Sequence, residues 1–249
     1  MNADDAPRSP RTRPHPPGSR GGRGAGAGPA RRTVAVLPIK RFSAAKSRLD
    51  HDLSEGTRRA LAEAMVTDVL IALRRAKRVD DVLVVSGENA AVALAAGYDA
   101  AAVIDDPDDA SHSAAAERGV QAALERGATR VLLVPGDCPA LDPVELDGLL
   151  ARPEQGPEVV VVPDRHGTGT NALLLTPPQV IHPAFGEGSR ERHERLAREA
   201  GATAAVVDVP TLGLDVDTLD DLEALRAALE RLRGGASHTR GLLARVSRR

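Results

Sequence analysis

Short apolar runs alternate with longer helical stretches along this sequence from Thr33 onward. Residues 33–40 form a run typical of a buried strand, and apolar side chains then recur every four positions on one helical face at Leu61, Met65, Val69 and Leu73. Further strand-like runs lie at residues 82–85, 101–104, 131–134, 159–162, 172–175 and 204–207. The alternation predicts an α/β fold with a mostly parallel central sheet flanked by helices.

The organisation of the chain follows from where this alternation begins and ends. The 249 residues, 42% of them hydrophobic, suffice for one substantial core, and we predict a single domain at residues 33–233. Residues 1–32 are rich in Pro, Gly and Arg and hold too few large apolar side chains to offset the entropy of ordering. Residues 234–249 carry four Arg and no acidic residue. We predict both terminal segments to be disordered basic tails.

Charge and composition exclude several classes of function. The two tails carry +5 and +4, so the formal net charge of -2 leaves -11 on the predicted domain. An acidic domain whose chain has only three aromatic residues, Phe42, Tyr98 and Phe185, lacks the basic groove and stacking surface of a specific nucleic-acid binder. Cys138 is the only cysteine, so no intramolecular disulfide forms, and no run approaches the roughly 18 apolar residues of a membrane span. We expect a cytoplasmic protein.

Two loops of small residues indicate a phosphate site. Residues 167–171 read Gly-Thr-Gly-Thr-Asn and precede a strand-like run, and residues 185–190 read Phe-Gly-Glu-Gly-Ser-Arg and precede a helix-like run. Loops of this kind bring bare backbone N–H groups close to an anion. They predict that the chain binds a phosphorylated ligand.

A cluster of cations follows the first predicted strand. Lys40, Arg41, Lys46 and Arg48 lie within nine positions, ahead of the first predicted helix. Ligands of open parallel sheets bind beyond the carboxyl ends of the strands. We therefore expect Lys40, Lys46 and Arg48 to neutralise a triphosphate during catalysis, with a solvated basic turn as the alternative.

Three aspartates also follow predicted strands. Asp137 lies in the turn after residues 131–134, and Asp215 and Asp217, two positions apart on an extended segment, point to the same side. Converging carboxylates can share a divalent cation, and Mg²⁺ fits because it takes few carboxylates and completes its shell with water and phosphate oxygens. The alternatives are a turn-forming role for Asp137 and a capping role for Asp217 at the helix that begins near Thr218.

Three further residues are weaker candidates. Cys138 has no evident partner for nucleophilic catalysis, which favours a packing role. His166 lies beside the predicted phosphate loop and His193 one turn into the following helix, and for both residues a ligand contact and an ordinary polar role stay open.

Six short segments occur in a fixed order along residues 33–230: Leu37-Pro-Ile-Lys40, Ala45-Lys-Ser-Arg-Leu49, Gly136-Asp-Cys-Pro139, Pro163-Asp-Arg-His-Gly-Thr-Gly-Thr-Asn-Ala-Leu173, Phe185-Gly-Glu-Gly-Ser-Arg-Glu-Arg-His193 and Leu214-Asp-Val-Asp-Thr218. Together they resemble the 2-phospho-L-lactate guanylyltransferases, whose actinobacterial relatives use phosphoenolpyruvate as the acceptor. Residues 167–171 and 185–193 are the specific parts of this resemblance. The basic loop and the Asp-Val-Asp sequence are shared by many nucleotidyltransferases.

The resemblance implies a GT-A-like (Rossmann-like) nucleotidyltransferase fold, GTP and Mg²⁺ as requirements, and a guanylylated three-carbon acid made for the deazaflavin coenzyme F-420. It implies metal ligands at Asp137, Asp215 and Asp217, and acceptor contacts at Thr170, Gly186 and Ser189. Where many relatives have Leu-Asn near the nucleoside, this chain reads Ser111-His112-Ser113. The strictness of guanine selection therefore stays open.

Three functions remain open at this point. The first is guanylyl transfer to phosphoenolpyruvate or 2-phospho-L-lactate, by a protein that could form a homodimer. The second is another NTP-dependent nucleotidyltransferase or a glycosyltransferase that uses Asp-Val-Asp to bind the metal of a sugar nucleotide. The third is a noncatalytic nucleotide-binding protein.

Overall fold

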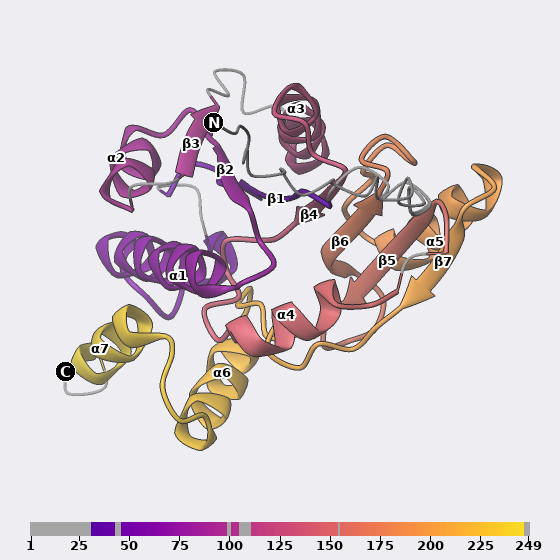
Figure 1. The fold of residues 1–249 in the computed structure, drawn as a ribbon. Coiled ribbons are helices and arrows are strands. Elements are labelled where there is room, and N and C mark those ends of the chain that lie inside the picture. The colour runs from indigo at the N-terminus through magenta and orange to yellow at the C-terminus, as the bar shows by residue number, and fades with distance from the viewer. Residues whose placement is uncertain (1–30, 43–45, 99–100, 105–110, 154, 247–249) are drawn as a thin grey trace, which may run out of the picture. The chain divides into compact units, whose positions relative to one another are not determined.

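In the computed structural model, the described residues are 31–42, 46–98, 101–104, 111–153 and 155–246. The predicted N-terminal tail, apart from Arg31 and Arg32, lies outside the described residues. From Thr33 onward the described chain forms one sheet with helices on both faces (Figure 1).

Seven strands form the sheet in the order β3-β2-β1-β4-β6-β5-β7. Their bounds are β1 Thr33–Pro38, β2 Asp81–Val85, β3 Ala101–Ile104, β4 Arg130–Leu133, β5 Glu158–Pro163, β6 Thr170–Thr176 and β7 Thr203–Val206. All neighbouring strands are parallel except at β6, which runs antiparallel to both β4 and β5. The predicted α/β class, the strand positions and the mostly parallel sheet are confirmed.

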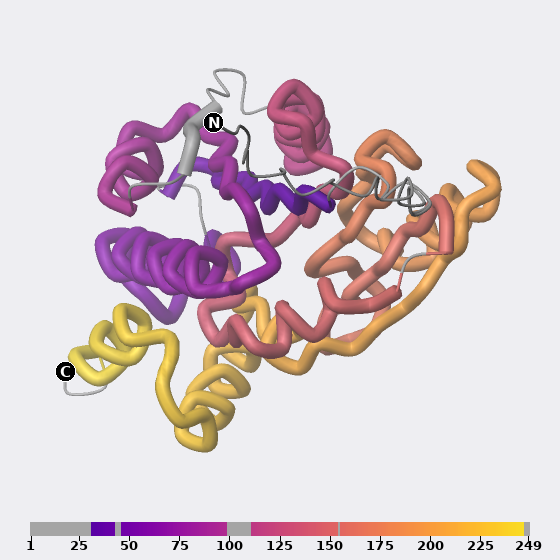
Figure 2. The backbone as a smooth tube through the Cα atoms, viewed as in Figure 1, coloured from indigo at the N-terminus to yellow at the C-terminus, as the bar shows by residue number. Residues whose placement is uncertain are grey.

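Helices cover both faces of the sheet, as the smoothed backbone in Figure 2 shows. One face packs against α1 (Glu55–Arg75), α2 (Asn89–Gly97) and α4 (Pro143–Leu150), and the other against α3 (His112–Glu125) and α5 (Ser189–Glu199). A third apolar cluster joins α1 to a short 3-10 helix (Ser47–Leu49), α6 (Leu219–Arg231) and α7 (Ser237–Val246). The apolar side chains of β1 alternate between the two faces because successive residues of a strand point to opposite sides.

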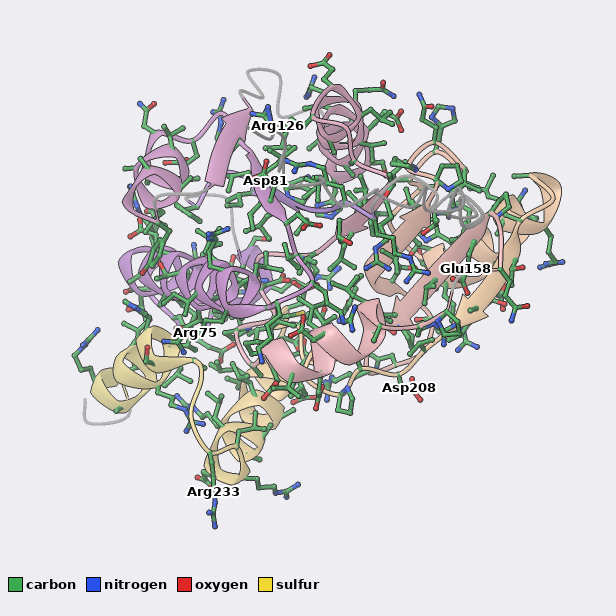
Figure 3. The ribbon with its side chains drawn as sticks, viewed as in Figure 1. Arg75, Asp81, Arg126, Glu158, Asp208 and Arg233 are labelled. Atoms are coloured by element: carbon green, nitrogen blue, oxygen red, sulfur yellow. The ribbon has the colours of Figure 1, made fainter. Side chains whose placement is uncertain are left out.

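Many charged side chains project outward from the surface of the domain. Figure 3 shows this for Asp208 beyond β7 and for Arg233 beyond α6. In the part of the chain that the structure describes, no helix combines the length and the apolar character needed to cross a membrane.

The reversed strand β6 decides which loops meet at the ligand-binding edge of the sheet. Leu133 of β4 pairs with Leu173, and Pro163 at the end of β5 pairs with Thr170. The beginning of β6 therefore lies beside the carboxyl ends of β4 and β5. As a result, residues 164–169, which join β5 to β6, share one edge with the loops that follow the parallel strands.

The C-terminal segment differs from its prediction as a disordered tail over most of its length. Residues 237–246 form α7, which packs along α1 and buries Thr239 and Leu243. The buried carboxylate of Asp68 on α1 accepts hydrogen bonds from the backbone N–H groups of His238 (3.1 Å) and Thr239 (2.8 Å). A side chain from another helix thus satisfies the first turn of α7, which its own sequence does not cap.

We expect Asp68→Ala to destabilise the docking of α7 by about 1–3 kcal/mol, because the buried N–H groups of its first turn would lose their acceptors. Asp68→Asn keeps one acceptor oxygen and serves as the matched control. Amide hydrogen exchange would measure the effect. Faster exchange confined to residues 237–246 in the alanine variant is the expected result, and unchanged protection would contradict the assigned role of Asp68.

Candidate active site

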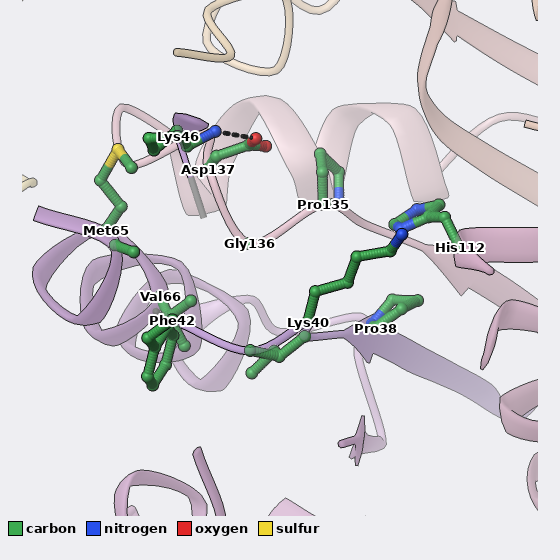
Figure 4. Close-up of a pocket in the computed structure, with 12 residues that line it drawn as sticks. Pro38, Lys40, Phe42, Lys46, Met65, Val66, His112, Pro135, Gly136 and Asp137 are labelled. Carbon is green, nitrogen blue, oxygen red and sulfur yellow. Dashed lines mark hydrogen bonds and ion pairs between the residues drawn. The ribbon is translucent and has the colours of Figure 1, made fainter. Parts of the chain in front are cut away.

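A cavity of about 260 Å³ opens at the carboxyl ends of β1 and β4. Its lining is largely apolar, with titratable side chains from Lys40, Lys46, His112 and Asp137 (Figure 4). The remaining lining residues are Pro38, Ile39, Phe42, Ala62, Met65, Val66, Pro135 and Gly136. An apolar pocket with a few polar groups at its rim is typical of a small-molecule site.

Lys46 is the central cation of this edge. Its backbone adopts the left-handed conformation (φ 59°), and only 7% of its side chain is exposed. Its Nζ lies 2.5 Å from Asp137 Oδ2 and 3.2 Å from Asp217 Oδ1. Burial alone would lower the pKa of this amine, but the two carboxylates outweigh burial and raise the pKa above its usual value. Lys46 is therefore a fixed positive charge between two aspartates, as Figure 4 shows for Asp137.

The other two predicted cations are held less firmly. Arg48 is 72% exposed and its Nη1 lies 3.5 Å from Asp217 Oδ2, a contact weakened by water. The side chain of Lys40 extends along the cavity toward His112 in Figure 4. The structure thus brings Lys46 and Arg48 to the same aspartate and places Lys40 on the cavity wall.

The three predicted aspartates converge. Burial, followed by the nearby charges of Asp137 and Asp217, raises the pKa of Asp215 to about 6, although a hydrogen bond from Asn171 opposes the shift. The buried amide of Asn171 donates to Asp215 Oδ1 (3.0 Å) and to the carbonyl of Leu212 (2.8 Å). Asn171 therefore ties the beginning of β6 to the segment that carries Asp215.

The capping role considered for Asp217 belongs instead to Asp221. Thr218 and Asp221 form a reciprocal capping box at α6, and Asp221 Oδ2 also accepts from the backbone N–H of Asp217 (3.0 Å). Arg165 contacts the other oxygen of Asp221 at 2.6 Å and joins the loop after β5 to this turn. The side chain of Asp217 is consequently left to face Lys46 and Arg48.

The charge of this cluster suits a divalent cation, but its present geometry does not form a metal site. Among the described residues, no three His, Cys, Asp or Glu side chains are arranged to hold a metal ion. The ammonium of Lys46 lies between Asp137 and Asp217 instead. Carboxylate oxygens are nevertheless the ligands that Mg²⁺ prefers. The combined negative charge of the three aspartates exceeds the positive charge of Lys46.

The two predicted phosphate loops are joined to each other. The backbone N–H of Arg190 donates to the carbonyl of Thr168 (3.2 Å), and its Nη1 donates to the carbonyl of Gly167 (3.0 Å). Gly186 (φ 115°) and Gly188 (φ 65°) adopt backbone conformations that favour glycine. Both loops therefore form one surface beside the start of β6.

The predicted acceptor residues differ in accessibility. Gly186 is exposed and Thr170 half-buried, whereas Ser189 is only 1% exposed and its N–H donates to the carbonyl of Gly186 (3.1 Å). Gly186 and part of Thr170 are thus accessible from solvent. Ser189 in this structure closes the turn between the loop and α5.

His193 has a more defined place than the sequence indicated. Its buried ring lies between Thr170 Oγ1, 3.0 Å from Nδ1, and the backbone N–H of Ala184, which donates to Nε2 at 2.9 Å. Burial, followed by the charge of Arg192, lowers its pKa to about 4, so the ring is neutral near pH 7. No sequence spacing identified this pair of contacts, since Ala184 contributes only its backbone.

The other weaker candidates have ordinary places. Cys138 is fully buried and its thiol donates to the carbonyl of Leu212 (3.3 Å), and burial raises the pKa of this thiol well above its usual value. The predicted packing role is confirmed. His166 is exposed on the loop between β5 and β6.

The segment 111–113 contacts the second small-residue loop. The backbone N–H of Phe185 donates to Ser113 Oγ (2.9 Å), and the Phe185 ring packs edge-on against His112 (4.8 Å between centroids) and His193 (5.3 Å). His112 also lines the cavity. A continuous row of rings therefore links the cavity wall to Thr170.

The neutral state of His193 makes stability depend on pH. Its pKa lies near 4 in the folded protein and near the usual 6.5 when unfolded, so between these values the unfolded chain binds a proton that the folded protein lacks. The stability is fully present above about pH 6.5 and is lost as the pH falls toward about 4. We expect the free energy of unfolding to fall by about 2 kcal/mol between about pH 7 and about pH 5, because each unit of pKa difference corresponds to about 1.4 kcal/mol.

Denaturant unfolding at both pH values would measure this loss. His193→Gln should show a smaller decrease over the same interval, because it has no ring to protonate. Equal decreases in the two proteins would show that His193 is not the group responsible.

A family model described as "Guanylyl transferase CofC like" matches residues 33–246. A phosphoenolpyruvate guanylyltransferase from Conexibacter woesei is 53% identical over 217 residues, which cover 87% of this chain and 97% of the relative. A 2-phospho-L-lactate guanylyltransferase from Methanothermobacter thermautotrophicus is 33% identical over 222 residues, covering 86% and 91% of the two chains.

The fold also has solved counterparts. A nucleotidyl transferase from Methanothermobacter thermautotrophicus aligns with a TM-score of 0.57 and 21% identity over 80% of this chain and 98% of that one. At this identity the likeness concerns the fold alone. It confirms the predicted GT-A-like nucleotidyltransferase architecture.

Proposed function

The chain belongs to the family of CofC-like guanylyltransferases, and from this premise we propose that it moves GMP from GTP onto the phosphate of phosphoenolpyruvate, with release of pyrophosphate. The observation that carries the choice of acceptor is the 53% identity to the phosphoenolpyruvate guanylyltransferase of Conexibacter woesei. The guanylylated product would enter the biosynthesis of the deazaflavin coenzyme F-420. We also propose a cytoplasmic location, and a homodimer stays a prediction.

The site supports a division between nucleotide and acceptor. We assign GTP to the cavity at the ends of β1 and β4, where Lys40 and Lys46 offer positive charge to its phosphates. We assign the acceptor to the surface made by the two small-residue loops, with Thr170, Gly186 and Ser189 as contacts. Ser189 is buried in the present structure, so its part in binding requires the turn at Gly186 to rearrange.

The reaction needs no general base from the protein. A phosphate oxygen of the acceptor attacks the α-phosphorus of GTP, a new P–O bond forms, and the bond to the β-phosphate oxygen breaks. The acceptor phosphate has a second pKa of about 6 and is largely dianionic at neutral pH. The two histidines near the loops agree with this mechanism, since His166 is exposed and both ring nitrogens of His193 are engaged. Positioning and charge neutralisation are then the tasks of the protein.

Charge neutralisation is the proposed role of the aspartate and lysine cluster. Asp137, Asp215 and Asp217 would hold Mg²⁺, which when bound offsets negative charge on the phosphate oxygens. Lys46 is already fixed between two of these carboxylates. As GTP binds, we propose that its ammonium turns to the phosphates, with Arg48 and Lys40 supporting it from the rim.

Pyrophosphate release from purified protein tests this proposal. Each of the four NTPs is supplied with Mg²⁺ and with phosphoenolpyruvate, 2-phospho-L-lactate or no acceptor. Release from GTP that requires phosphoenolpyruvate is the expected result, and efficient use of other NTPs would contradict guanine selection. Preference for 2-phospho-L-lactate would show that this compound, and not phosphoenolpyruvate, is the acceptor. No pyrophosphate release under any condition would reject the proposed reaction.

A further inference from the structure

We propose that His193 is a positioning residue for the acceptor, holding the Thr170 hydroxyl so that its hydrogen points to the acceptor anion. The inference rests on the proposed function for the identity of the anion. It depends on two hydrogen bonds to the His193 ring and on the place of Thr170 at the start of β6.

The contact with Ala184 fixes the tautomer of the ring. A backbone N–H can only donate, so His193 Nε2, 2.9 Å from Ala184 N, must accept and carries no proton. The single proton of the neutral imidazole then lies on Nδ1. The pKa of about 4 agrees with a ring that stays neutral in the folded protein.

The tautomer in turn fixes the hydroxyl of Thr170. Nδ1–H donates to Thr170 Oγ1 over 3.0 Å, so the threonine oxygen accepts and its own hydrogen is directed elsewhere. Within the described parts of the chain, no residue accepts that hydrogen. Thr170 is half-buried at the edge where the two small-residue loops meet. A hydroxyl that must donate there suits a carboxylate or phosphate oxygen.

The surroundings keep the His193 ring in this orientation. Phe185 packs edge-on against it with ring centroids 5.3 Å apart, and the N–H of Phe185 is held by Ser113. The ring is fully buried on the first turns of α5. It therefore has no exposed nitrogen with which to touch the acceptor, and its influence passes through Thr170.

A double-mutant cycle tests this indirect role. His193→Gln keeps an acceptor near the position of Nε2 but removes the donor near Nδ1, whereas His193→Asn keeps a donor near Nδ1. Each is combined with Thr170→Val, and Thr170→Ser retains the hydroxyl as the matched control. KM and kcat for phosphoenolpyruvate and for GTP are measured by pyrophosphate release, with thermal unfolding as a check on folding.

We expect His193→Gln and Thr170→Val each to raise the KM for phosphoenolpyruvate about tenfold, as for one lost hydrogen bond to a charged group, with the KM for GTP unchanged. Thr170→Ser and His193→Asn should have KM values for phosphoenolpyruvate closer to that of the wild type. In the Thr170→Val background, His193→Gln should have little further effect, because the group through which it acts is absent. Independent, multiplicative effects of the two substitutions would overturn the inference, and so would equal effects on both substrates.

A spectroscopic measurement tests the geometry without turnover. Long-range ¹H–¹⁵N correlation spectra of the wild-type protein should show His193 protonated at Nδ1, and protonation at Nε2 would overturn the inference. A wild-type protein that shows the Nδ1 tautomer but no guanylyl transfer would instead reject the proposed function. If the protein is active but the effects of His193→Gln and Thr170→Val are independent, the positioning role of His193 is rejected and the proposed function stands.

Discussion

Asp137→Asn and Asp217→Asn are each expected to lower Mg²⁺-dependent pyrophosphate release by about 10³-fold, the size of effect that follows loss of a charge stabilising the transition state. Both carboxylates contact Lys46, and Asp215 lies close enough for their negative charges to raise its pKa. Replacing either aspartate weakens the proposed metal site and removes a partner of Lys46 at the same time. The fold should persist, because both side chains lie partly exposed at the edge of the sheet.

Steady-state rates across a range of Mg²⁺ concentrations would measure this effect. Asp208→Asn removes one carboxylate at an exposed position beyond β7 and serves as the control, with activity expected to match the wild type. Circular dichroism and thermal unfolding confirm that the variants are folded. Full activity in Asp137→Asn or Asp217→Asn would rule out the proposed metal site.

Lys46→Met is expected to lower kcat by about 10²–10³-fold, because the side chain keeps its approximate length but loses the charge that offsets the phosphates in the transition state. It also leaves Asp137 and Asp217 without the ammonium that lies between them.

Two further variants separate the possible causes of that loss. Lys46→Arg keeps the charge but changes its shape, and partial activity is expected of it. Lys77→Met removes a charge from an exposed lysine after α1 and should leave kcat unchanged. If Lys46→Met retained wild-type kcat with only a higher KM for GTP, Lys46 would bind the ground state and take no part in stabilising the transition state.

Much of the fold could be predicted from local sequence patterns. Each of the seven strands lies where an apolar run predicted it. Burial on both faces accounts for the continuous apolar runs of β1, β4 and β5, whose residues are all buried. The helix that begins near Thr218 was also predicted, and its capping box depends on two residues within one turn, Thr218 and Asp221. The convergence of the aspartates followed from their places after strands.

The features that escaped prediction depend on pairs far apart in the sequence. Asp68 stabilises the start of α7 although 171 positions separate it from Thr239. No pattern within residues 234–249 indicates a contact with Asp68. Lys46 occupies the place between Asp137 and Asp217, whereas the sequence predicted three carboxylates around a metal. The tautomer of His193 depends on the hydrogen bond from the backbone N–H of Ala184, a contact that no side-chain pattern encodes.

The direction of β6 has a consequence for how substrate choice can change within this architecture. Because β6 returns to the edge where β5 ends, the loop after β5, the first residues of β6 and the start of α5 all come from one continuous stretch, residues 163–193. The cavity assigned to the nucleotide is built from residues 38–137. In the proposed assignment, the nucleotide cavity and the acceptor surface are therefore encoded by separate stretches of the gene, and Asp215 and Asp217 of the proposed metal site lie outside both. Recombination within one piece can alter the acceptor while the nucleotide half is inherited intact.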